Sequence, residues 1–495
     1  MKRASRWGAL TLALLALFPA TTVPQVTDGV PRFEPGACPF PAPRGVACGD
    51  LVVPEDRMHP ADSRAIRLAV AIVRSRSDSP APDPVAFLAG GPGSSAVAYA
   101  SEPLDSPFLD TRDLILVDQR GAGYSEPHLA CPEWEAALVE NLTRVLSDEE
   151  ETAREVEAAI RCRDRLIGEG VDLAAYNTAA SAADLDALRR VLGYAQWNLY
   201  GVSYGTRLAL TVMRDYPGGV RSAVLDSANP PNVDEWVALA PAAASAFGRL
   251  LAACAADPAC ASAYPDLEAD LYTLVDRLNG EPLAMAMVHP LTGENLDLLL
   301  TGSDIADGLV HLFFSPASIR SLPAIIRAAG QGNLNVLRPA AEGALYARLF
   351  PASGMTLSVQ CHDEAPFNAP PAVAAAMETV PPPLRNLFFL RFQATACPVW
   401  AAGDAGPIED EPVASDIPTL VLAGEYDPVT PPAWGQLTTE TLGGGFYFEF
   451  PGLSHGVTGA ECPRRMAAAF VDNPTAAPDA GCIDRMPPVR FAVGR

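Results

Sequence analysis

Short apolar runs, each followed by a loop that contains glycine, alternate along the chain with segments that carry a helical apolar stripe. Residues 85–89, 114–118 and 197–202 form such runs, which are typical of strands buried on both faces of a sheet. Residues 182–192 and 203–216 instead show apolar positions at helical spacing. Strands and helices in alternation predict an α/β fold with a mostly parallel sheet flanked by helices.

The middle of the chain has a different pattern. Residues 230–412 are rich in alanine and consist mainly of amphipathic helical segments with few strand signals. The strand pattern resumes at 417–424 and 446–450. We therefore expect a core made of residues 26–229 and 413–495, with residues 230–412 inserted as a large helical cap over the carboxyl edge of the sheet.

The N-terminus has the pattern of an export signal. Basic residues at 1–6 precede an apolar run from Trp7 to Phe18, which is too short to span a bilayer comfortably. We expect residues 1–25 to be a signal peptide cleaved between Ala20 and Gln25, and the protein to be secreted or periplasmic without a stable membrane anchor. An uncleaved anchor is the alternative that the sequence leaves open.

Composition excludes several classes of chemistry. The 495 residues are 49% hydrophobic and 19% charged, which is typical of a globular protein with a well-buried interior. The formal net charge of −24 argues against nucleic acid as a partner. Lys2 is the only lysine, so a mature chain has no lysine for a Schiff base or a phosphate loop. We expect no cofactor.

The ten cysteines indicate disulfides in an exported chain. No C-x-x-C or H-x-x-x-H spacing is present, so we expect no metal site. Pairing between neighbours along the chain is our prediction, although sequence alone leaves the connectivity open. The predicted pairs are Cys38–Cys48, Cys131–Cys162, Cys254–Cys260, Cys361–Cys397 and Cys462–Cys482.

The candidate nucleophile is Ser203, in the string Gly201-Val202-Ser203-Tyr204-Gly205. The string lies between a predicted buried strand and a predicted helix. Small flanking residues there permit a sharp turn that exposes the serine hydroxyl at the edge of the sheet. The positive end of the helix favours negative charge at the same place.

A serine nucleophile needs a base and an acid that orients it. Of the six histidines, His455 follows the last predicted strand, where a base on the carboxyl edge is expected. Asp427 follows the preceding strand and gives the order serine, acid, histidine. Glu425 and Asp226 are rival acids that the sequence does not eliminate.

An oxyanion intermediate needs two hydrogen-bond donors. One is the backbone N–H of Tyr204, the residue after the nucleophile. The other is expected from the loop Gly90-Gly91-Pro92-Gly93, which follows a predicted buried strand. Glycine lets this backbone approach a substrate closely, and we assign the second donor to Gly91.

Together the motifs resemble a known family. The segments 90–93, 118–125, 201–206 and 427–431 look like those of the proline iminopeptidase and tripeptidyl aminopeptidase group of α/β-hydrolases, in its secreted bacterial branch with a TAP-like C-terminal region. The resemblance implies an α/β-hydrolase fold and a serine exopeptidase that removes N-terminal residues or short N-terminal peptides through an acyl-enzyme. Ala89 stands where proline iminopeptidases usually have histidine, which weakens the narrow proline-specific assignment.

The resemblance also implies an acidic feature of the cap that holds the substrate's free amine. Asp363 and Glu364 are the candidates, since a protonated amine requires a carboxylate. Arg120 is interpreted as a structural clamp rather than a catalyst.

Two other functions remain open: an esterase or lipase-like serine hydrolase that acts on small acyl esters, and a binding protein without activity on the same fold.

Overall fold

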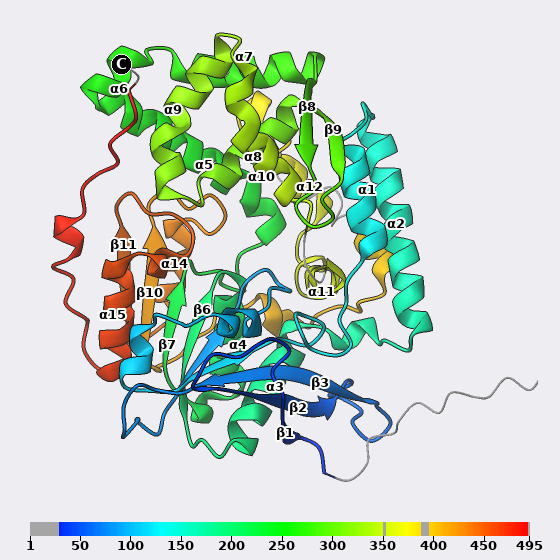
Figure 1. Cartoon of the computed structure of the whole chain (residues 1–495), viewed down its shortest axis with the longest axis vertical. Coiled ribbons are helices and arrows are strands. Elements are labelled where there is room, and N and C mark those ends of the chain that lie inside the picture. Colours follow the sequence, from blue (N-terminus) through cyan, green and yellow to red (C-terminus); the bar gives the residue numbers. More distant parts are fainter. Residues whose placement is uncertain (1–28, 350–352, 388–395, 494–495) are drawn as a thin grey trace, which may run out of the picture.

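The computed structural model describes residues 29–349, 353–387 and 396–493. A twisted sheet and its flanking helices form one half of the molecule, and a helical cap forms the other half (Figure 1). The predicted signal peptide, residues 1–25, lies outside the described residues.

The central sheet has nine strands among the described residues, in the order β1-β2-β3-β5-β4-β6-β7-β10-β11. The pairs from β1 to β5 are antiparallel. The pairs from β5 through β4 to β11 are parallel, as the sequence predicts. The bounds are β1 Arg32–Gly36, β2 Val46–Pro54, β3 Ala65–Val73, β4 Val85–Leu88, β5 Leu114–Val117, β6 Trp197–Val202, β7 Val220–Asp226, β10 Thr419–Gly424 and β11 Gly445–Phe450.

Alternate residues of the short apolar strands pack against opposite layers. In β5, Ile115 and Val117 join a cluster with α3 and α4, whereas Leu114 and Leu116 join a cluster with α15. This period of two explains why strands buried on both faces are apolar at every position. The flanking helices are α3 Thr178–Val191, α4 Tyr204–Asp215, α14 Pro432–Thr439 and α15 Glu461–Asp472.

The cap is mainly helical and contains one hairpin, β8 Leu283–Val288 and β9 Asn295–Leu300. Helix α5 is long and apolar enough to cross a membrane, judged by its length and composition only. However, Trp236 and Phe247 of this helix are buried in the cap. The cap helices are α5 Glu235–Ala256, α6 Pro258–Ala263, α7 Leu267–Gly280, α8 Gly302–Leu312, α9 Pro316–Gly330, α10 Arg338–Tyr346, α11 Ser353–Val359 with a π-helical turn Gln360–Glu364, and α12 Pro370–Met377.

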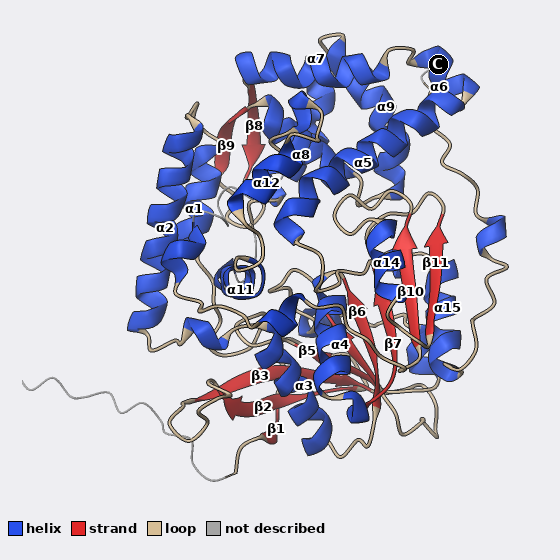
Figure 2. Ribbon diagram, turned by 180° about the vertical axis from the view of Figure 1, so that it is seen from behind, coloured by secondary structure: helices blue, strands red, loops and turns tan. Residues whose placement is uncertain are grey.

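The helical layer also takes in a segment that precedes the expected insertion at residue 230. Helices α1 Pro132–Asn141 and α2 Asp148–Gly168 lie beside the β8–β9 hairpin in both views (Figures 1 and 2). Leu299 N–H donates a hydrogen bond to Leu142 O at 2.7 Å, and Leu142 belongs to the buried cluster of the cap. The sequence assigns α1 and α2 to the expected core, residues 26–229, because their contacts with the cap join residues far apart in the chain.

All five predicted disulfides are present: Cys38–Cys48, Cys131–Cys162, Cys254–Cys260, Cys361–Cys397 and Cys462–Cys482. This confirms pairing between neighbours along the chain. Such a set is typical of proteins that fold in an oxidising compartment.

Candidate active site

Ser203 lies on a strained turn between β6 and α4. Its backbone has φ 58° and ψ −130°, which few residues other than glycine adopt. Both flanking glycines are required sterically, because a Cβ on Gly201 would lie 2.3 Å from Gly205 O and one on Gly205 would lie 2.0 Å from Leu88 O. The turn therefore has the geometry that the sequence predicts for a nucleophile.

Asp427 and His455 lie together on the loops that follow β10 and β11. His455 Nδ1 is 2.9 Å from Asp427 Oδ2, and only 2% of Asp427 is exposed. Thr430 also contacts both residues, because its hydroxyl donates to Asp427 Oδ2 at 2.8 Å and lies 3.0 Å from His455 Nδ1. If Nδ1–H donates to the carboxylate, Nε2 is left to accept a proton.

The two rival acids make other contacts. Glu425 accepts a hydrogen bond from Gly452 N–H at 2.7 Å. The carboxylate of Asp226 accepts hydrogen bonds from Val457 N–H at 2.8 Å and Thr458 N–H at 2.9 Å. Asp226 therefore anchors the loop that carries the histidine. Among the three candidate acids of the sequence, Asp427 is the one that bonds the imidazole.

The pKa values of the acid and the base move in the directions that a charged pair requires. Burial alone would raise the pKa of Asp427, but the charge and hydrogen bond of His455 lower it overall. Burial alone would lower the pKa of His455, but Asp427, with a smaller contribution from Asp226, raises it above 6.5. Both shifts favour a carboxylate beside an imidazole that readily accepts a proton.

Asp226 also connects the nucleophile to the histidine loop. Ser203 N–H donates to Asp226 O at 3.0 Å, while the side chain of Asp226 holds Val457, two residues after His455. Among the described residues, no hydrogen bond joins Ser203 Oγ to the imidazole. Such bonds often tighten only when a substrate is bound.

The predicted oxyanion donors belong to the loop that lies against Ser203 and to the start of α4. Gly91 has φ +114°, and a Cβ on the preceding Gly90 would lie 2.9 Å from Ser203 Cβ. Tyr204 is the first residue of α4, so its N–H has no acceptor within the helix. Within the described part of the chain, neither Gly91 N–H nor Tyr204 N–H donates a hydrogen bond to the protein.

The glycine-containing loops are held by buried polar side chains. Asp118 accepts hydrogen bonds from Val97 N–H at 2.9 Å and Tyr124 N–H at 2.8 Å. Arg120 is fully buried and donates to Asp184 at 2.7 and 2.9 Å. These contacts hold Arg120 in the interior of the protein, which supports its interpretation as a structural clamp.

The two carboxylates assigned to the substrate's amine lie in the π-helical turn of the cap and are buried. Glu364 forms an ion pair with Arg207 of α4 and accepts a hydrogen bond from Asn368 Nδ2 at 3.0 Å. Asp363 accepts from Thr178 N–H at 3.0 Å and contacts His362 Nδ1 at 2.6 Å. Since protein groups hold both carboxylates, their role in amine binding stays a prediction.

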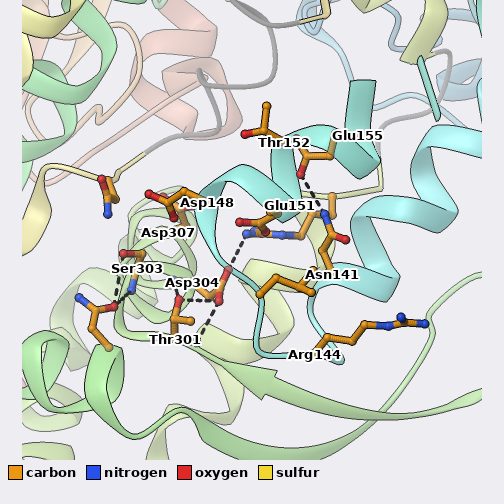
Figure 3. Close-up of a pocket in the computed structure, with 14 residues that line it drawn as sticks. Asn141, Arg144, Asp148, Glu151, Thr152, Glu155, Thr301, Ser303, Asp304 and Asp307 are labelled. Atoms are coloured by element: carbon orange, nitrogen blue, oxygen red, sulfur yellow. Dashed lines mark hydrogen bonds and ion pairs between the residues drawn. The ribbon is translucent and has the colours of Figure 1, made fainter. Parts of the chain in front are cut away.

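A cavity of about 370 Å³ lies away from this site, between α1–α2 and the cap. Figure 3 shows carboxylates around it, including Asp148, Glu151 and Asp304. Asp304 pairs with Arg348 at 2.6 Å, and none of Ser203, Asp427 and His455 lines the cavity. The cavity therefore lies outside the candidate active site.

Comparison with known proteins agrees with this geometry. A family model described as alpha/beta hydrolase fold matches residues 83–294, and one described as TAP-like protein matches residues 387–482. The first segment contains the turn at Ser203. The second contains Asp427 and His455, so the two models together span all three residues.

Named relatives and a solved structure extend the comparison. The chain is 26% identical over 461 residues to serine protease Hip1 of Mycobacterium tuberculosis, covering 88% of this chain and 87% of the relative. It is 29% identical over 213 residues to tripeptidyl aminopeptidase of Streptomyces lividans, covering 41% and 39%.

The structure of proline iminopeptidase from Mycobacterium smegmatis is 17% identical, with a TM-score of 0.38 and coverage of 86% and 98%. The chain is a serine hydrolase with the α/β-hydrolase fold and a TAP-like C-terminal segment, and it is similar to proteins named tripeptidyl aminopeptidase and proline iminopeptidase.

Proposed function

We propose that the protein is an exported serine exopeptidase that removes single residues or short peptides from the N-terminus of peptide substrates. One observation carries the proposal: Asp427 bonds His455 at 2.9 Å, inside the segment that matches the TAP-like model. Relatives named serine protease and tripeptidyl aminopeptidase support a peptide as the substrate. The five disulfides support export. We expect no nucleic-acid partner and no stable membrane anchor.

The reaction is acyl transfer to Ser203. His455 takes the hydroxyl proton as Ser203 Oγ attacks the peptide carbonyl, and the N–H groups of Gly91 and Tyr204 stabilise the oxyanion. His455 then gives the proton to the leaving nitrogen as the C–N bond breaks. A water molecule that loses a proton to His455 hydrolyses the acyl-enzyme and restores the serine hydroxyl.

An exopeptidase of this kind must recognise a free N-terminus with a carboxylate. Asp363 and Glu364 are candidates from the sequence, and both are held by protein partners. Glu235, in the first turn of α5, is a partly exposed member of the same network. Its carboxylate accepts from Asn229 Nδ2 at 3.3 Å, and Asn229 N–H donates to Thr206 Oγ1 at 2.7 Å, close to the nucleophile turn. Glu235 is therefore the member of this network best placed to meet an ammonium group.

Product masses test the proposal most simply. The purified protein is incubated with matched free and N-acetylated peptides, and Ser203→Ala serves as the inactive control. We expect loss of N-terminal fragments from the free peptides alone. Glu235→Gln should raise KM for free peptides, while the exposed cap substitution Glu281→Gln should not. Turnover of simple acyl esters without cleavage of any peptide would reject the exopeptidase and favour the esterase alternative.

A further inference from the structure

Three aromatic rings of the cap extend from the imidazole of His455. The ring of Phe314 lies 5.3 Å from that of His455 at an interplanar angle of 74°. His311 lies 5.5 Å from Phe314 and 5.1 Å from Tyr346, between ring centroids. His311 is near the end of α8, Phe314 follows that helix, and Tyr346 ends α10. The three side chains form a continuous aromatic surface, which we call the aromatic wall.

The cap does not bury Phe314 or Tyr346. Phe313 is completely buried and packs edge-to-face on Phe247 at 5.1 Å. The next residue, Phe314, is 38% exposed, and Tyr346 is 62% exposed. Large apolar side chains that stay exposed beside a catalytic group are typical of ligand sites. The wall is therefore available to a substrate.

The proposed mechanism fixes which part of a substrate meets the wall. His455 must reach the leaving nitrogen to protonate it, whereas the acyl carbonyl faces Gly91 and Tyr204. The residue that departs with the leaving nitrogen thus lies on the imidazole side, where Phe314 packs. Burial lowers the pKa of His311, which favours the neutral ring at pH 7 and adds no charge to this surface.

We propose that His311, Phe314 and Tyr346 form the subsite for the residue on the leaving side of the cleaved bond and select large apolar or aromatic side chains there. This inference rests on the proposed function and deepens it. A leaving residue with such a side chain gains ring contacts and buries apolar surface on Tyr346. A glycine at that position gains neither contact.

Competition for the acyl-enzyme tests the subsite directly. The acyl-enzyme is formed from one ester with a fixed acyl group, and phenylalaninamide or glycinamide is added as an alternative to water. The amine nitrogen attacks the ester carbonyl, its proton passes through His455 to Ser203 Oγ, and an amide replaces the serine ester. The ratio of amide to acid product reports binding on the leaving side.

The wild-type enzyme should prefer phenylalaninamide over glycinamide by about tenfold or more, as expected for an apolar subsite. Tyr346→Ala and Phe314→Ala should remove most of this preference. The preference for one amine over the other is not affected by a change in the triad, because both amines react with the same acyl-enzyme and the same base. Leu291→Ala, which alters an exposed apolar residue of the cap outside the wall, should keep the preference.

The subsite would be overturned if the wild type reacted equally with phenylalaninamide and glycinamide. It would also be overturned if the preference for phenylalaninamide survived in both Tyr346→Ala and Phe314→Ala. The esters used here form the acyl-enzyme even if the protein cleaves no peptide, so the subsite and the exopeptidase are tested separately. A protein that forms no acyl-enzyme from any ester would overturn both proposals.

Discussion

Asp226 is bonded both to Ser203 and to the loop that carries His455. Its backbone oxygen accepts from Ser203 N–H at 3.0 Å, and its carboxylate accepts from Val457 N–H at 2.8 Å. The carboxylate is fully buried. A residue that the sequence offered only as a rival acid therefore positions the nucleophile and the base relative to each other.

Asp226→Asn should lower kcat by about 10- to 100-fold, because a small displacement of a catalytic group is costly. It should also move the acid limb of the kcat/KM profile to lower pH, since Asp226 helps to raise the pKa of His455. A pH series of the variant beside the wild type checks both effects. A fall in rate with an unmoved acid limb would mean that Asp226 acts through structure alone.

Thr430 is predicted to support the acid. Thr430→Val removes the hydroxyl that donates to Asp427 Oδ2 at 2.8 Å and should reduce kcat by about tenfold, since a hydrogen bond to a charged group contributes about 1.5–3 kcal/mol. Thr430→Ser keeps the hydroxyl and should retain most of the activity. Equal rates for the valine and serine variants would contradict this role.

The wild-type pH profile should reflect the raised pKa of His455. A protonated imidazole cannot accept the serine proton, so activity is lost as the pH falls through the pKa of the folded protein. Since that pKa lies above 6.5, the acid limb of kcat/KM should have its midpoint above pH 6.5. A midpoint at or below 6.5 would contradict the charge pair with Asp427.

The ion pair between Arg207 and Glu364 is predicted to support stability. Both residues are 3% exposed, so Glu364→Ala leaves a buried cation without this partner and should cost about 3–5 kcal/mol. Thermal unfolding of this variant, with exposed Glu342→Ala as the control, measures the loss. An unchanged Tm with a raised KM for free peptides alone would instead support the amine-binding role assigned from sequence.

Much of the catalytic core was predictable because local pattern determines it. Strands such as β5 are apolar at every position since both faces are covered. The turn at Ser203 requires Gly201 and Gly205 for steric reasons that the string itself reveals. The order of Ser203, Asp427 and His455 follows from the order of the strands in the sheet.

What the sequence did not reveal depends on contacts between distant segments. Asp363 and Glu364 are predicted to bind the substrate's amine, yet Arg207 and Thr178 of other helices hold their carboxylates. Phe314 looks like any cap residue until the fold brings it to His455. Such placements leave no periodic or local signal in the chain.

Labelling with a fluorophosphonate probe tests the central claim most directly. The folded protein should form one covalent adduct, located at Ser203 by peptide mass spectrometry. The adduct should be absent in Ser203→Ala and strongly slowed in His455→Ala, because the hydroxyl is nucleophilic only beside its base. A folded wild-type protein without an adduct at Ser203, or with equal labelling in the His455 variant, would contradict the account.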